Sequence, residues 1–177
     1  MMLETFKKEV LPLKNKLYRY ALSILGDHDL SMDVVQETML KVWEKQSDFK
    51  EIRNPEAWCM TLTRNFALDK FRSKIHSTLE LKSEHDRENT EKSPYQQIES
   101  GNLMELIDRI VAMLPQKHRE TFQLRDIEGY SYQEISEISG YSVPDVKVSI
   151  FRARKEIRSQ LLKLQTYELE KSRSTSR

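Results

Sequence analysis

The sequence predicts an all-α protein that consists of two small helical domains. Glycine is scarce, with four residues in a chain of 177, and charged residues make up 32% of the total, which favours helices over a turn-rich β fold. Apolar residues recur at helical spacing in two blocks, and a polar segment rich in acidic residues separates the blocks. We therefore expect a first domain at residues 1–75, a flexible linker at 76–100 and a second domain at 101–177.

Composition and motifs exclude several classes of function. Cys59 is the single cysteine, so no internal disulfide can form, and a reducing, cytoplasmic location is the simpler expectation. The four histidines lack metal-ligand spacing, and no apolar run approaches the roughly 20 residues that span a bilayer. No glycine-rich phosphate loop, nucleophile elbow or zinc-protease motif is present. We expect no cofactor, no metal, no membrane insertion and no enzymatic activity.

Three helices are expected in the first domain, near residues 5–25, 29–45 and 55–73, packed as one bundle. Gly26-Asp27 supplies a break after the first helix, and Asn54-Pro55 joins an N-cap to a proline that suits the first helical position. The inward, apolar positions follow a helical period at Leu17, Tyr20, Ala21, Ile24, Val34, Val35, Met39, Val42, Trp43, Trp58, Leu62, Phe66 and Leu68.

The outer face of the second helix is mostly acidic. It carries Asp33, Gln36 and Glu37, with Lys41 as its one cation. A solvated helix face is the common explanation for such a strip. A recognition surface for a basic protein partner is the more specific interpretation, and the residues alone leave both open.

Cations alternate with aromatic rings on the third helix. The cations are Arg64, Lys70 and Arg72, and the rings are Trp58, Phe66 and Phe71. This pattern suits single-stranded DNA, because bases stack on rings while the phosphates follow the positive charge. For Trp58 and Phe66 a place in the core is the favoured interpretation. Phe49 lies in a polar loop, where a core role explains it less well.

The second domain contains a predicted helix-turn-helix. Ser131 with Glu134 and Ser142 with Asp145 each fit a capping box at the start of a helix. Gly140 lies between the two helices, where a tight turn can require a positive φ. A short helix, a turn and a second helix is the layout that presents a helix to the major groove of DNA. The expected inward residues of this unit are Ile135, Ile138, Val146 and Ile150. An apolar stripe precedes the unit at Leu103, Leu106, Ile107, Ile110 and Leu114, and after Pro115 the apolar residues Phe122, Leu124 and Ile127 follow.

The second helix of this unit has the residues of a DNA-facing surface. Residues 142–177 hold nine Lys and Arg against four Asp and Glu, although the whole chain has a net charge of only +1. A solvated helix end is the alternative, because cations also favour a helix C-terminus. The outward positions near the helix start, which could reach base edges, are Ser142, Val143, Pro144, Asp145, Lys147, Val148 and Ser149. The cations further along, which would hold phosphates, are Arg152, Arg154, Lys155 and Arg158.

Four phrases of the sequence, taken in order, resemble a known family. They are DVVQETMLKVW, NPEAWCMTLTRNFALDKFR, LPQKHRETFQLRDIEGYSYQEISEISGYSV and VKVSIFRARKEIR. They resemble bacterial RNA polymerase sigma factors of the extracytoplasmic-function (ECF) type, which belong to the sigma-70 family. The phrases span nearly the whole chain, and the short form of that family has only regions 2 and 4, like the two blocks here.

The resemblance implies a transcription initiation factor that binds core RNA polymerase and directs it to promoters. Asp33, Gln36 and Glu37 stand at positions that bind the β′ clamp helices, and the β flap is a second polymerase partner. Phe49 and Asn65 match a pocket for a base flipped from the −10 element, where extrusion costs a few kcal/mol. Arg64, Lys70 and Arg72 would hold the melted strand, and region 4 would read the −35 duplex. The resemblance also allows an anti-sigma factor as a partner.

The sequence departs from the family pattern at the helix that would read DNA. Relatives often have S-V-G-T-V-K-S-R-L where this chain has SVPDVKVSI. Asp145 could accept a hydrogen bond from a cytosine amino group, but helix capping is the favoured interpretation. The −35 sequence therefore cannot be transferred from relatives. A stand-alone helix-turn-helix regulator is the rival hypothesis, and it leaves the first domain without a polymerase partner.

Overall fold

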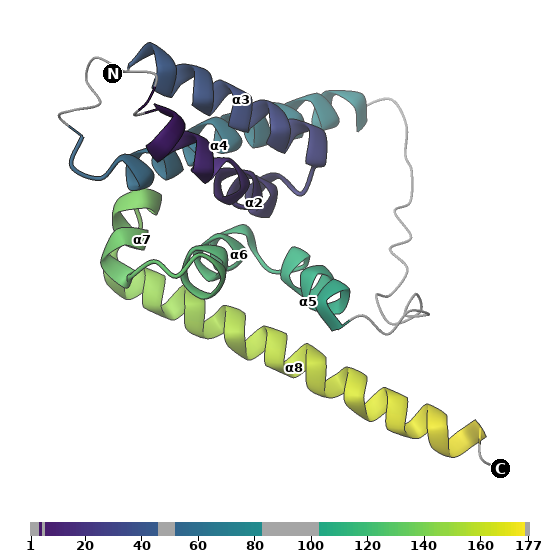
Figure 1. The fold of residues 1–177 in the computed structure, drawn as a ribbon. Coiled ribbons are helices and arrows are strands. Elements are labelled where there is room, and N and C mark those ends of the chain that lie inside the picture. The colour runs from purple at the N-terminus through teal and green to yellow at the C-terminus, as the bar shows by residue number, and fades with distance from the viewer. Residues whose placement is uncertain (1–3, 5, 46–51, 83–102, 176–177) are drawn as a thin grey trace.

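The computed structural model describes residues 4, 6–45, 52–82 and 103–175. Every regular element among these residues is helical, which confirms the predicted all-α class. The chain forms a first bundle from α2, α3 and α4, followed by a second unit from α5 to α8 (Figure 1). No described helix is long and apolar enough to cross a membrane.

The first domain is a bundle of three long helices after two short helical turns. The turns η1 (Phe6–Val10) and η2 (Leu11–Leu13) lead into α2 (Lys14–Leu25), which packs against α3 (His28–Glu44) and α4 (Pro55–Lys82). The core side chains are fully buried where the helical period predicted, at Leu17, Tyr20, Ile24 and Val34, and Met60 of α4, which was not predicted, is buried with them. Trp43 was expected to point inward but is 40% exposed, because it lies at the edge of the buried stripe of α3.

The predicted helix boundaries are set by local capping. Gly26 ends α2 with a φ of 60°, a conformation that glycine adopts without a steric penalty. Asp27 then caps α3 by accepting from the backbone N–H of Leu30 at 3.1 Å. The side chain of Asn54 accepts from the N–H of Ala57 at 3.0 Å, next to the proline that begins α4.

The third helix is longer than predicted. It continues to Lys82, so residues 76–82, which were assigned to the linker, are helical. The reason is local, because neither glycine nor proline follows Pro55 before residue 82. The rest of the predicted linker, residues 83–100, lies outside the described residues.

The second domain contains the predicted helix-turn-helix. Its elements are α5 (Leu103–Ala112), α6 (Gln116–Phe122), the π-helical turn η5 (Gln123–Ile127), α7 (Tyr132–Ser139) and α8 (Val143–Thr175). Ser131 and Glu134 form the complete capping box of α7, and Gly140 makes the turn with a φ of 73°. The four inward residues of this unit, Ile135, Ile138, Val146 and Ile150, are buried as predicted. Of the apolar residues that follow Pro115, Leu124 is buried, whereas Ile127 is 53% exposed.

The two domains share one continuous core. In Figure 1, α6 lies next to α2, and α7 lies next to the start of α4. Leu124 and Ile135 of the second domain pack in the same apolar cluster as Leu17 and Met60 of the first. The domains are therefore in contact in this structure, which the sequence did not predict.

Candidate polymerase and nucleic-acid interfaces

The acidic strip of α3 is accessible to a partner. Asp33 and Gln36 are exposed, and the Glu37 side chain is 42% exposed. Glu37 Oε1 lies 2.6 Å from Nζ of Lys70 on α4, and this contact raises the pKa of the lysine. The strip therefore presents two of its three polar side chains freely and holds the third against a cation.

Exposed apolar side chains continue the same face of α3. Leu40 is 63% exposed and Trp43 40% exposed, at helical spacing after Gln36 and Glu37. The Trp43 ring packs edge-on against Phe6, with ring centroids 5.3 Å apart. Sequence reasoning missed this extension, although the spacing from residue 36 to 40 was available to find it. The face is thus acidic at one end and apolar at the other, a combination that fits a protein partner.

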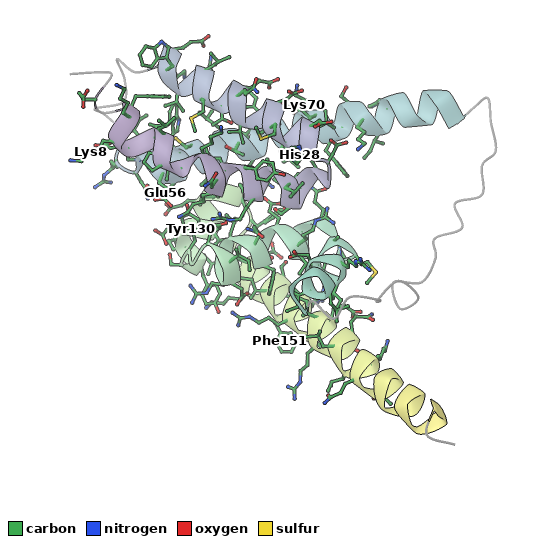
Figure 2. All side chains as sticks on the ribbon, turned by 45° about the vertical axis from the view of Figure 1, so that its right-hand side comes forward. Lys8, His28, Glu56, Lys70, Tyr130 and Phe151 are labelled. Atoms are coloured by element: carbon green, nitrogen blue, oxygen red, sulfur yellow. The ribbon has the colours of Figure 1, made fainter. Side chains whose placement is uncertain are left out.

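The predicted −10 residues on α4 are in different environments. Asn65 is exposed, and Arg72 is exposed beside Asp69, with an N–O distance of 3.3 Å. Lys70 lies on the side of the first domain away from the second (Figure 2). Trp58 and Phe66 pack against the core, in agreement with the favoured interpretation. Phe49, the other proposed pocket residue, lies outside the described residues.

Arg64 is buried between the domains, where we expected an accessible cation. Its side chain is 13% exposed, and its Nε donates to Glu120 on α6. The fully buried Glu120 carboxylate also accepts from the hydroxyl of Tyr20 at 2.8 Å and that of Tyr141 at 3.2 Å. We call these four residues the Glu120 cluster. In this arrangement the Arg64 guanidinium, which was predicted to hold a phosphate, binds the Glu120 carboxylate instead.

Further polar contacts surround this cluster at the junction of the domains. Arg19 of α2 makes two hydrogen bonds of 2.8 Å to the carboxylate of Glu128. Glu56 pairs with Lys16 at 2.6 Å and accepts from the hydroxyl of Tyr130, which lies beside it at the junction (Figure 2). Burial and this carboxylate raise the pKa of the Tyr130 hydroxyl. The contacts join polar groups that lie far apart in the sequence.

The start of α8 supports the capping role of Asp145. Its N–H donates to the hydroxyl of Ser142 at 3.3 Å, and its carboxylate accepts from that hydroxyl at 2.9 Å. Lys117 of α6 lies 3.4 Å from the same carboxylate. The Ser142 hydrogen bond and the nearby lysine lower the pKa of Asp145. The carboxylate is thus held by its own domain.

Most of the predicted duplex-reading positions lie on the surface of α8. Pro144, Lys147 and Val148 are exposed, and Val143 is partly exposed. Phe151, which sequence reasoning missed, is 67% exposed and projects from α8 (Figure 2). Ser149 is only 3% exposed, so its prediction as an outward residue is wrong. It follows Val146 by one helical turn and falls on the buried face.

The cations farther along α8 are accessible to different degrees. Arg152 and Lys155 are exposed. Arg154 is half-exposed, and its Nη2 lies 2.6 Å from the carboxylate of Asp126, which also accepts from Nε at 3.1 Å. A phosphate must therefore compete with Asp126 for this guanidinium, whereas it can approach Arg152 directly.

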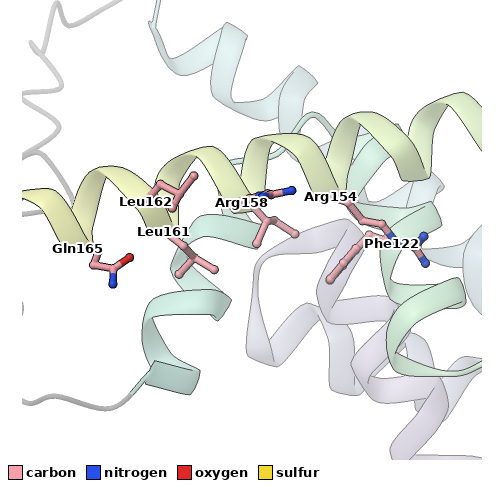
Figure 3. A pocket seen from close by; sticks show the side chains of 7 residues that line it. Phe122, Arg154, Arg158, Leu161, Leu162 and Gln165 are labelled. Atoms are coloured by element: carbon pink, nitrogen blue, oxygen red, sulfur yellow. The ribbon is translucent and has the colours of Figure 1, made fainter.

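An apolar groove lies beside the same helix. Its volume is about 280 Å³, and Phe122 of α6 forms one side of it (Figure 3). The α8 residues that line it are Arg154, Ile157, Arg158, Leu161, Leu162 and Gln165. An apolar floor with arginines at the edge fits an amphipathic helix with acidic flanks. The described part of the chain holds no cluster of three or more His, Cys, Asp or Glu side chains that could bind a metal.

Comparison with known proteins assigns both domains. Residues 10–75 match sigma-70 region 2, and residues 104–157 match sigma-70, region 4. The ECF RNA polymerase sigma factor SigL of Mycobacterium tuberculosis (strain H37Rv) is 30% identical over 155 residues, which cover 84% of each chain. This chain belongs to the ECF sigma factors. It is a transcription initiation factor of the class that directs RNA polymerase to promoters.

Other relatives agree with this assignment. EcfG of Rhodopseudomonas palustris is 27% identical to this sigma factor, and the match covers 89% of this sigma factor and 86% of EcfG. SigE of Mycolicibacterium smegmatis is 29% identical, but the match spans 58% of that longer protein. The solved structure of RpoE of Bartonella quintana, in complex with the anti-sigma factor NepR, has a TM-score of 0.72 and 30% identity. It covers 90% of this sigma factor and 97% of RpoE.

The two candidate interfaces belong to different regions of the sigma factor. The acidic strip of α3 belongs to region 2, and the helix-turn-helix belongs to region 4. A stand-alone regulator is not favoured, because the region 2 match accounts for the first domain as well. The match to region 4 ends at residue 157, within α8, so the distal half of the groove lies beyond it.

Proposed function

We propose that this sigma factor docks on core RNA polymerase through the acidic strip of α3 and reads promoters with α4 and α8. The observation that carries the proposal is the separation of charge. The acidic Asp33 is exposed beside the neutral Gln36 on one domain, and the cationic Arg152 and Lys155 are exposed on the other. A protein partner and a polyanion can then be held at once without competing for one surface. The docking partner is the β′ clamp helices.

Region 2 also captures the −10 element as a melted strand. Asn65 is exposed on α4 and can donate to or accept from a flipped base, and Phe49 is proposed to complete the pocket. Lys70 and Arg72, with Arg64 once it is released, hold the phosphates. Strand capture stabilises the open promoter, so the energy of melting comes from binding and no catalysis is involved.

Region 4 reads the −35 duplex through the first two turns of α8. The base edges are contacted by Val143, Pro144, Lys147 and Val148, while Ser142 and Asp145 cap the start of the helix. Arg152, Arg154 and Lys155 contact phosphates and fix the register. Ser149 has no part in this surface, because it is buried.

The groove on α8 is proposed as the docking site for the β flap. Ile157 and Leu161 supply apolar contact, and Arg158 at the edge complements acidic flanks on a partner helix. The work of this factor is carried out in the cytoplasm, with polymerase and promoter DNA. An anti-sigma factor is a further partner of the family, and RpoE of Bartonella quintana was solved with one.

The deciding experiment is co-purification with core polymerase. Asp33→Lys with Glu37→Lys should lower polymerase affinity at least about tenfold, because like charge then faces the basic partner. The matched control is Glu9→Lys with Glu137→Lys, which makes the same charge change at two exposed sites elsewhere. Equal binding by the wild type and the strip variant would contradict the docking assignment and favour a stand-alone regulator.

A further inference from the structure

The exposed side of the first turns of α8 is mostly apolar. Pro144, Lys147, Val148 and Phe151 stand at positions i, i+3, i+4 and i+7, so they lie on one face of the helix. All four are exposed, Val148 by 47% and Phe151 by 67%. Phe151 projects from the helix (Figure 2). We call these four residues the reading face, and three of them have no polar side-chain atom.

The reading face can donate hydrogen bonds but cannot accept them. Its one polar group is the ammonium of Lys147, which has three donors and no acceptor. Nζ of this lysine lies 5.6 Å from the centroid of the Tyr132 ring, which places it towards α7 at the border of the face. The amino groups that cytosine and adenine present in the major groove need an acceptor. The group that an apolar side chain can contact there is the 5-methyl group of thymine.

The acceptors next to the reading face are held by their own domain. The hydroxyl of Ser142 accepts from the N–H of Asp145 at 3.3 Å and donates to its carboxylate at 2.9 Å. The same carboxylate lies 3.4 Å from Nζ of Lys117. A cytosine or adenine amino group would have to compete with these contacts at the helix cap. Base contact therefore falls to the apolar side chains and to Lys147.

Cations border the reading face on both sides. Arg152 and Arg154 follow Phe151 by one and three positions, which puts them on opposite sides of it at 3.6 residues per turn. Arg152 is exposed, and the Arg154 side chain is 50% exposed. Lys155 lies between Phe151 and Leu162, the next exposed apolar residue in this direction. The apolar surface is thus short and flanked by positive charge, which complements a major groove between two phosphate backbones better than an apolar helix of a protein.

We propose that the reading face recognises thymines of the −35 duplex through their 5-methyl groups, with Val148 and Phe151 as the contacting side chains. This inference rests on the proposed function, because it requires α8 to lie in the major groove. Lys147 adds a donor for the N7 and O6 acceptors of guanine. Burial of one methyl group against an apolar side chain corresponds to about fourfold in affinity.

Removal of the methyl group from the DNA tests the proposal with the unaltered protein. Core polymerase reconstituted with the full chain first selects duplexes from a library with random bases at the −35 position, which defines the preferred element. Each thymine of that element is then replaced by deoxyuridine, which lacks only the 5-methyl group and keeps base pairing. In gel shifts the wild type should bind at least one such duplex about fourfold more weakly. Deoxyuridine placed upstream of the element is the control and should leave affinity unchanged.

Protein variants assign the lost affinity to side chains. Val148→Ser and Phe151→Ala should each weaken binding to the thymine duplex. For the methyl group that each side chain contacts, the affinity ratio of the thymine duplex to the deoxyuridine duplex should fall from about four to about one. Met113→Ala truncates an apolar side chain of region 4 that is 51% exposed and lies outside α8, so it should keep the wild-type ratio.

The possible results separate methyl recognition from the proposed function. Equal binding of the thymine and deoxyuridine duplexes by the wild type would overturn methyl recognition and leave the −35 assignment standing. A ratio of about four that persists in both variants would mean that DNA shape senses the methyl groups, and it would overturn the roles of Val148 and Phe151. Failure of the selection to enrich any −35 sequence would overturn reading by region 4, and methyl recognition with it.

Discussion

Nζ of Lys70 lies 2.6 Å from Oε1 of Glu37, so a proposed DNA contact and a proposed polymerase contact neutralise each other across α3 and α4. The two side chains are 31% and 42% exposed, and an exposed pair of this kind contributes little to stability. Under the proposed function, a partner that binds one of the two side chains frees the other. We therefore expect polymerase docking on Glu37 to release Lys70 towards the DNA strand.

Lys70→Ala should therefore change the two affinities in opposite directions. Core polymerase should bind about two- to fivefold more tightly, since Glu37 no longer has a competing cation. Single-stranded DNA should bind more weakly, because one phosphate contact is lost. Fluorescence anisotropy measures both affinities. Lys14→Ala removes the same charge from an exposed site on α2 and should leave polymerase affinity unchanged. Weaker polymerase binding by Lys70→Ala would contradict this relationship.

Arg152→Ala and Arg154→Ala should weaken duplex binding across all sequences and lessen its salt dependence. The slope of log affinity against log salt should fall by about one for Arg152, which is exposed. For Arg154 the fall should be smaller, because Asp126 already pairs with it. Asp126→Asn should correspondingly strengthen duplex binding. An unchanged slope in Arg152→Ala would mean that this arginine does not touch phosphate.

Asn65→Ala should slow promoter opening more than initial binding. Its side chain is exposed on α4 and is proposed to contact a flipped base, which exists only after melting. Permanganate footprinting reports the melted strand, and gel shifts report initial binding. A loss confined to the gel shift would be the opposite pattern and would remove Asn65 from the pocket.

Alkaline pH should weaken the contact between the two domains. The pKa of Tyr130 is raised by burial and by the hydrogen bond to Glu56 of the other domain. The packed domains then keep a proton that they release when they separate, so the stabilisation is complete below the ordinary tyrosine pKa of 10.0 and is lost as pH rises above it. Each pH unit above that value should remove up to about 1.4 kcal/mol. Energy transfer between dyes at Asn15→Cys on α2 and Gln133→Cys on α7, two exposed positions, measures the effect. Tyr130→Phe should lessen the dependence, and an identical pH profile would argue against it.

The helix-turn-helix was predictable because its signals are local. Ser131, Glu134 and Gly140 determine a cap and a turn within ten residues, and the structure has both. The burial of Ser149 was also within reach, since it lies three residues after Val146 on the same helix face.

The Glu120 cluster could not be predicted from the sequence. Arg64 and Glu120 are 56 positions apart, and each fits an ordinary amphipathic helix. Burial of a cation and a carboxylate against each other depends on how the two domains pack, and no periodic pattern within either domain records that packing. The length of α4 has a different cause, because its continuation past residue 75 reflects the local absence of glycine and proline, which the sequence does record.

The claim that this sigma factor directs core polymerase to promoters is tested most directly by transcription. Core polymerase is reconstituted with the sigma factor, and transcripts are measured on a library of promoter fragments. The wild type should produce transcripts from a defined set of promoters that core polymerase alone ignores. Asp33→Lys with Glu37→Lys should abolish those transcripts, whereas the control with Glu9→Lys and Glu137→Lys should retain them. Equal transcript sets with and without the protein would contradict the account.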